Sequence, residues 1–301
     1  MRKTPVLSSS RLVILLTALI VVVVSAAALQ ALTAPPPPQE PDTIAQGGEK
    51  PMSWADVDRL ISEQKFEAAS EAVTAIRERA REAGDAGEWT RALVEETKLR
   101  MALHGYETAV RFLRAQPWPE EAVSQAVLEL YYANSLATYA RVYSWEIRQR
   151  ERVETSGELD LKAWDLERIV EEADRAYFEV WSHRGGWGSE PLGGLARYIQ
   201  QNNYPPRIRG TLRDAVTYLW IELLADTSLW SPAESNDVFR LDAAALIAGD
   251  PESSAAVALD NPAVHPLVKI SALLDDLEAW HAAGDRPVPI TDGGHPLHEL
   301  F

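Results

Sequence analysis

Residues 120–153 read EEAVSQAVLELYYANSLATYARVYSWEIRQRERV and carry the clearest periodicity in the chain. Large apolar side chains recur in this stretch at steps of four, four, three, four and four residues: Leu128, Tyr132, Leu136, Tyr139, Tyr143 and Ile147. This spacing matches the α-helical repeat and keeps all of these side chains on one face. The stretch therefore predicts a long amphipathic helix whose apolar face must be covered by a partner helix.

The same helical spacing recurs on both sides of this stretch. Further helices are predicted from residue 53 onward and over residues 66–83, 89–103, 106–113, 161–183, 212–226, 232–249 and 266–283. Outside the N-terminal apolar segment, no run of β-branched residues alternates with period two, and no Asn-Gly or Asp-Gly turn is flanked by such runs. The sequence therefore predicts an all-α fold.

Local signals mark where these helices begin and end. Ser53–Asp56 and Thr211–Asp214 have the spacing of capping boxes, and Ser231-Pro232 places proline in the first turn of a helix. The tripeptide Ala-Gly-Asp occurs at residues 83–85, 248–250 and 283–285. Glycine there favours a left-handed helix end, and the aspartate that follows can cap the next helix.

Helices of this length, joined by short breaks, stack as antiparallel neighbours. We therefore expect residues 52–301 to form an array of antiparallel helical hairpins, a degenerate tetratricopeptide-like α-solenoid without a clean 34-residue period. Residues 212–226 are apolar on most sides, which predicts a helix at the centre of the array. Residues 277–284 resemble the first helix of a further hairpin, so we expect the array to be truncated at its C-terminal end.

The N-terminal segment, residues 1–34, is predicted to direct export. Its apolar run, Leu12 to Leu32, is long enough to cross a bilayer, and Arg2, Lys3 and Arg11 precede it. The length of the run favours a retained signal anchor, whereas small-residue sites near Ala27 leave a cleaved signal peptide as the alternative. We expect a single pass through a bacterial inner membrane with the N-terminus in the cytoplasm and the body in the periplasm, or a periplasmic protein after cleavage.

Residues 35–51 are rich in proline and glycine and predict a linker between the membrane and the folded body. Three of the 29 basic residues and none of the 45 acidic residues lie in residues 1–34, so the remainder carries a net charge of −19. Such a charge repels nucleic acid and anionic lipid surfaces. We expect no nucleic-acid partner and membrane contact through residues 12–32 alone.

The chain has no cysteine, which excludes disulfides, a thiolate nucleophile, cysteine-ligated zinc and a lipoprotein anchor. His295, His298 and Glu299 form a weak metal motif because Pro296 interrupts the helical spacing that paired histidine ligands need. The remaining histidines are expected in cap or surface positions: His104, His183, His265 and His281. We expect no metal site and no cofactor.

No catalytic signature is evident. The adjacent acid pairs point about 100° apart on a helix and are expected on solvated faces: Glu95-Glu96, Glu171-Glu172 and Asp275-Asp276. The serines lack a nucleophile elbow, and the glycines of residues 185–194 lack the lysine of a phosphate loop. The ten tryptophans and nine tyrosines predict packing between helices, or alternatively an exposed aromatic groove for a protein partner.

Two stretches carry a resemblance to a known family. Residues 203–219, NYPPRIRGTLRDAVTYL, and their continuation to Trp230 resemble the N-terminal helical region of large bacterial alpha-2-macroglobulin-like proteins, as does GYETAVRFL at residues 105–113. The similarity covers residues 53–301. It implies a role in trapping proteases. However, the chain has no thioester cysteine, no β-sandwich pattern and no recognisable bait region, so no functional residue of the family can be carried over.

Two functions are therefore expected, neither of them enzymatic. The first is a protease-defence component of the cell envelope that acts with downstream macroglobulin-type domains. The second is a membrane-tethered periplasmic scaffold that binds a protein partner through its helical repeats.

Overall fold

The computed structural model describes residues 51–150, 159–200, 208–249 and 254–284. The chain divides into two units, Met1–Lys50 and Pro51–Phe301, and all described residues belong to the second. They form helices and turns, with no β-strand among them, so the all-α prediction is confirmed for this part of the chain. Within the described ranges, none of the helices combines the length and the hydropathy that spanning a bilayer requires. The predicted segment at residues 12–32 and nearly all of the linker at 35–51 lie outside the described residues.

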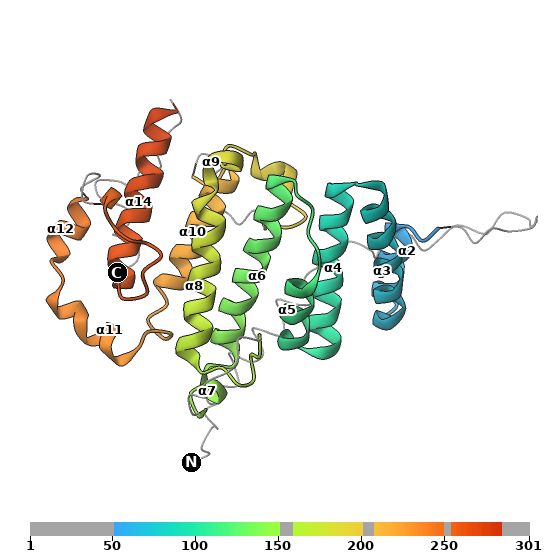
Figure 1. Cartoon of the computed structure of the whole chain (residues 1–301), viewed down its shortest axis with the longest axis horizontal. Helices are drawn as coiled ribbons and strands as arrows, with labels where there is room; N and C mark the ends of the chain where they lie inside the picture. Colours follow the sequence, from blue (N-terminus) through green and yellow to red (C-terminus); the bar gives the residue numbers. More distant parts are fainter. Residues whose placement is uncertain (1–50, 151–158, 201–207, 250–253, 285–301) are drawn as a thin grey trace, which may run out of the picture. The chain divides into compact units, whose positions relative to one another are not determined.

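The first helices follow one another in antiparallel succession (Figure 1). They are α2 (Trp54–Ser62), α3 (Phe66–Ala83), α4 (Ala86–His104) and α5 (Tyr106–Ala115), and each packs against the next. The Ser53 capping box that begins α2 is confirmed. Gly84 ends α3 at φ 67° in the left-handed region, and Asp85 then caps α4 by accepting a hydrogen bond from the Glu88 amide. The Ala-Gly-Asp prediction holds at this break.

The long helix predicted over residues 120–153 is shorter than expected. It forms α6 (Ala122–Val142), followed after Tyr143 by the single turn α7 (Ser144–Ile147). The apolar stripe does not define one face, because α4, α5 and α8 (Leu166–Ser182) all contact α6. Consequently α6 is buried on nearly every side, whereas Tyr143, at the break, is partly exposed. Residues 151–153 lie outside the described residues.

Helix α10 (Leu212–Leu224) is covered by other helices on most sides, as its apolar residues predict. It begins with the Thr211–Asp214 capping box and packs against α8, α6 and α14 (Pro266–Ala283). Between α8 and α10 the glycine-rich residues form the short helices α9 (Arg184–Trp187) and η2 (Leu192–Leu195). A Cβ on Gly188 would collide with the Arg184 carbonyl oxygen and lie 3.2 Å from the Arg213 Cβ, so only glycine lets α9 and α10 approach this closely.

The single helix predicted over residues 232–249 is wrong. The segment contains α11 (Pro232–Asp237), η3 (Val238–Arg240) and α12 (Ala243–Ala248), because Leu241 is extended and Asp242 caps a new helix. The predicted left-handed helix end is wrong at Gly284, whose φ is −91°. At Gly249 the φ of 66° is positive, as predicted, but the ψ of 147° is extended and not left-handed helical. The expected truncation of the last hairpin stays untested, because residues 285–301 lie outside the described residues.

Candidate functional site

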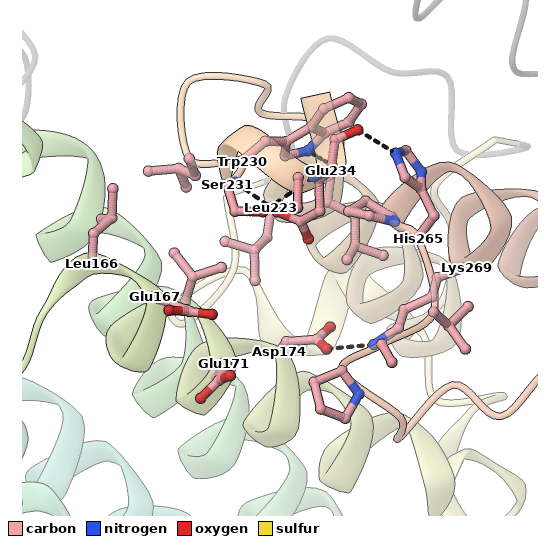
Figure 2. Close-up of a pocket in the computed structure, with 18 of the residues that line it drawn as sticks. Leu166, Glu167, Glu171, Asp174, Leu223, Trp230, Ser231, Glu234, His265 and Lys269 are labelled. Carbon is pink, nitrogen blue, oxygen red and sulfur yellow. Dashed lines mark hydrogen bonds and ion pairs between the residues drawn. The ribbon is translucent and has the colours of Figure 1, made fainter. Parts of the chain in front are cut away.

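A pocket of about 420 Å³ lies between the N-terminal half of α8, the turn after α10, α11 and the turn that leads into α14 (Figure 2). Its walls are mostly apolar. They are formed by Leu166, Val170, Leu223, Leu224, Leu229, Trp230, Pro232, Ala233, Pro262, Ala263, Val264 and Pro266. The volume falls within the range of sites that hold small ligands or a few side chains of a partner.

The pocket contains a buried ion pair. The Lys269 ammonium group, on α14, lies 2.6 Å from a carboxylate oxygen of Asp174 on α8, and the lysine is only 2% exposed. The second oxygen of Asp174 accepts a hydrogen bond of 2.7 Å from the indole Nε1 of Trp220 on α10. These contacts join three helices, and they occupy both oxygens of the carboxylate.

Trp230 and His265 form the opposite side of the pocket. The His265 Nδ1 accepts a hydrogen bond from the Leu267 amide, so the ring proton is assigned to Nε2, which lies 3.0 Å from the Glu234 carbonyl oxygen. His265 thus caps α14, as expected from the sequence. The Trp230 ring meets the imidazole edge to face with centroids 5.2 Å apart. Ser231 and Glu234 form the capping box of α11.

The charged groups that line the pocket are mainly acidic. Glu167, Glu171 and Asp174 follow one another along α8 at a spacing of four and three residues, which places them on one face over about 10 Å. Figure 2 shows Glu234 on the facing side, on α11. With Asp237 these make five carboxylates against two cations, Arg148 and Lys269, which gives a net charge of −3 at the lining.

A second polar cluster joins α10 and α14. One oxygen of Asp214 accepts hydrogen bonds from the backbone and hydroxyl of Thr211, and the other lies 2.8 Å from the His281 Nε2. His281 is 3% exposed, so its predicted cap or surface position is wrong. His104 and His183 stand at the ends of α4 and α8, as expected.

The predicted solvation of the acid pairs is also wrong in part. Glu96 is fully buried between two arginines, lying 2.7 Å from the Arg100 guanidinium and 3.4 Å from that of Arg77. Asp275 is 5% exposed. Asp276 accepts hydrogen bonds from Arg184 and Arg213, which draw α9 and α10 onto α14.

A further buried acid, Glu129, lies on α6 beside Arg114 of α5. Burial raises the pKa of Glu129 above its ordinary value, although the Arg114 guanidinium lies 2.9 Å from one of its oxygens. Burial acts in the same direction on nearby Glu172, but hydrogen bonds from Arg175 and Tyr132 outweigh it and lower that pKa. The sequence does not reveal this cluster, because its members lie in different helices.

Most aromatic side chains in the described part pack between helices, and several are covered by arginine. Arg91 lies 3.7 Å from the Trp54 ring centroid, and Arg184 lies 3.3 Å from that of Trp181. The large exposed aromatics among the described residues are Trp145 (77%) and Phe239 (90%), with Tyr143 partly exposed. They do not form a continuous aromatic groove, so packing is the better interpretation of the aromatic content.

Within the described ranges, no three histidine or acidic side chains are placed to hold a metal ion. The tail motif of His295, His298 and Glu299 lies outside those ranges. No family model matches the chain, and no curated protein and no solved structure matches it either.

Proposed function

We propose that this protein is a non-enzymatic helical scaffold that holds a segment of a partner protein in the pocket between α8, α11 and the start of α14. The observation that carries this proposal is the combination of apolar walls with charged side chains along the rim. Binding sites for peptides and small ligands commonly combine a mostly apolar concavity with a few placed polar groups.

The polar groups of the pocket favour binding over catalysis. Asp174 is already bonded to Lys269 and Trp220, and both ring nitrogens of His265 are engaged with the backbone. A general acid or base must reach the proton that it transfers. Groups held in this way define the shape of the pocket, and they are poorly placed to take part in a reaction.

The exposed aromatics extend the contact surface that a partner could use. Trp145 precedes the lining residue Arg148 by one helical turn, and Phe239 follows the lining residue Asp237 by two positions. Aromatic residues are enriched at protein interfaces, where each buries a large area at a small cost in conformational entropy. A partner seated in the pocket would have these side chains within reach of its flanking residues.

The remainder of the proposal concerns architecture and location. Residues 52–301 act as a degenerate tetratricopeptide-like solenoid, an arrangement favoured by the antiparallel succession of α2 to α6. Residues 12–32 anchor the chain in a bacterial inner membrane with its body in the periplasm, or they are removed as a signal peptide after export. The partner is accordingly a protein of the cell envelope.

A site-specific photocrosslinker tests the proposal in cells that produce the full chain. Placed at Ala263, a lining residue, the crosslinker should give one discrete adduct that mass spectrometry identifies as an envelope protein. The adduct should disappear when A233W fills the pocket from α11, and it should be absent when the crosslinker stands at exposed Glu82 on α3. Equal adducts from both positions, or insensitivity to A233W, would refute a role for the pocket.

A second candidate function rests on the sequence similarity at residues 203–230. In this proposal the chain is the leading helical part of a protease-trapping system, and macroglobulin-type domains are the partner. Sequencing the genomic DNA beyond the codon for Phe301 tests it. A β-sandwich coding sequence there would support the proposal, and an unrelated gene would remove its basis.

A further inference from the structure

We propose that the segment bound in the pocket is basic: an extended stretch of a partner protein in which lysine or arginine alternates with apolar residues. This inference rests on the proposed function and adds the chemical class of the ligand. It follows from how charge and apolar surface are distributed around the cavity.

The charge of the lining is the first argument. Lys269 is buried and neutralised by Asp174, so it contributes little positive potential at the mouth. Arg148 is held at the rim by a hydrogen bond to the Ser228 carbonyl oxygen. Arg148 is then the one remaining cation in the lining, against four carboxylates: Glu167, Glu171, Glu234 and Asp237. This excess of three negative charges makes the cavity favourable for cations.

Some of these carboxylates already have arginine neighbours, but those pairs lie at the surface. Glu171 is 3.9 Å from Arg168, and Asp237 is 2.8 Å from Arg240, whose side chain is 82% exposed. Exposed pairs at this spacing contribute only a few tenths of a kcal/mol, roughly 0.3–0.5. An incoming cation in a partly desolvated pocket can therefore displace them.

The geometry is the second argument. The acidic edge on α8 faces Glu234 on α11 across the apolar side chains of Leu166 and Leu223, as Figure 2 shows. Long basic side chains suit such a site, because their methylene stems bury against apolar walls while their charged ends reach carboxylates at the rim. A small inorganic cation would leave those walls uncovered.

The volume is the third argument. A cavity of about 420 Å³ holds a few side chains rather than a folded element, so the ligand enters as an extended segment or a loop. The net charge of −19 on residues 35–301 adds a long-range attraction for the same class of partner. Acidic and uncharged segments lack this attraction.

The test uses the full chain in neutral detergent micelles and three fluorescein-labelled peptides. The basic probe is GLRVKLRLG, the uncharged probe replaces Arg and Lys by Gln, and the acidic probe replaces them by Glu. Fluorescence anisotropy should show binding of the basic probe only, weakening as salt is raised. E167Q/E171Q should weaken binding about tenfold, because it removes two of the rim carboxylates.

The matched control is E67Q/E71Q. These two acids are exposed on α3 with the same four-residue spacing, and their substitution changes the net charge by the same amount. It should alter the affinity less than about twofold, since the α3 acids are absent from the pocket lining. R148Q, which removes a cation from the rim, should tighten binding a few-fold. If E167Q/E171Q and E67Q/E71Q lost affinity for the basic probe equally, the net charge alone would explain the attraction, and the inference would be overturned.

Two further variants separate the inference from the proposed function. A233W and A263W fill the cavity from α11 and from the turn before α14, and each should abolish binding of the basic probe while circular dichroism stays unchanged. An uncharged or acidic probe could bind as tightly as the basic probe and be blocked by both variants. The pocket would then remain a peptide site, and the inference that its ligand is basic would be wrong. If neither variant affects any probe, the proposed function fails, and the inference fails with it.

Discussion

Replacing Lys269 with methionine tests the structural role of the ion pair in the pocket. The substitution keeps the length and most of the volume of the side chain but removes its charge. Asp174 would retain the hydrogen bond from Trp220 and lose its cationic partner in a site where its own side chain is 15% exposed. Removing one partner of a buried ion pair typically costs about 3–5 kcal/mol, because the remaining charge stays desolvated and uncompensated.

The assay is urea unfolding of the full chain in detergent, followed by far-ultraviolet circular dichroism. With a slope of about 3 kcal/mol per molar urea, a loss of 3–5 kcal/mol lowers the midpoint by about 1–1.7 M. The double variant D174L/K269M removes both charges, and we expect it to recover most of the loss, since an apolar pair of similar volume avoids the desolvation cost.

The control is R240A, which removes the exposed partner of Asp237 on the α11 side of the pocket. It should change the unfolding free energy by less than about 1 kcal/mol. The reasoning would be refuted if K269M cost no more than R240A. It would also be refuted if D174L/K269M lost as much unfolding free energy as the single variants D174L and K269M lose in total.

Three further predictions address other parts of the chain. Because burial raises the pKa of Glu129 in the folded state, the wild type should lose stability as pH rises above about 4.3, the value expected for the unfolded chain. E129Q cannot lose this proton, so it should become more stable relative to the wild type over the same pH range. Urea midpoints of both proteins at several pH values measure the difference. G188A should lower the thermal midpoint by several degrees, because its Cβ would collide with the Arg184 carbonyl oxygen and crowd Arg213 on α10. G185A, with open space around it, serves as the control. Alkaline phosphatase fused after residue 50 should be active when the fusion is produced in a bacterial host, because the enzyme folds only after export, and deletion of residues 12–32 should abolish that activity.

Much of the helical framework could be predicted because its signals are local. The spacing of apolar residues in 66–83 and 266–283 and the capping boxes at Ser53 and Thr211 each involve residues within a few positions of one another. The breaks at Tyr143 and at Leu241 were missed, because neither position carries a glycine or a proline to mark the end of a helix.

The candidate pocket could not be predicted in the same way. Asp174 and Lys269 are 95 residues apart, and Asp214 and His281 are 67 residues apart. No local spacing relates such residues. The sequence also misassigned Glu96 and Asp275 to solvated faces, because helical position alone does not show which neighbouring helix will cover a polar side chain.

The amino-acid sequence is enough to predict that this protein is built from helices, where most of them begin, and that its body is acidic and free of cysteine. Those properties follow from composition and from interactions between residues close together in the chain. Which charges are buried together, and where a cavity remains between α8, α11 and α14, depends on how the helices pack. The physical reason is that desolvation and packing depend on what adjoins a side chain in space, and those neighbours come from distant parts of the chain.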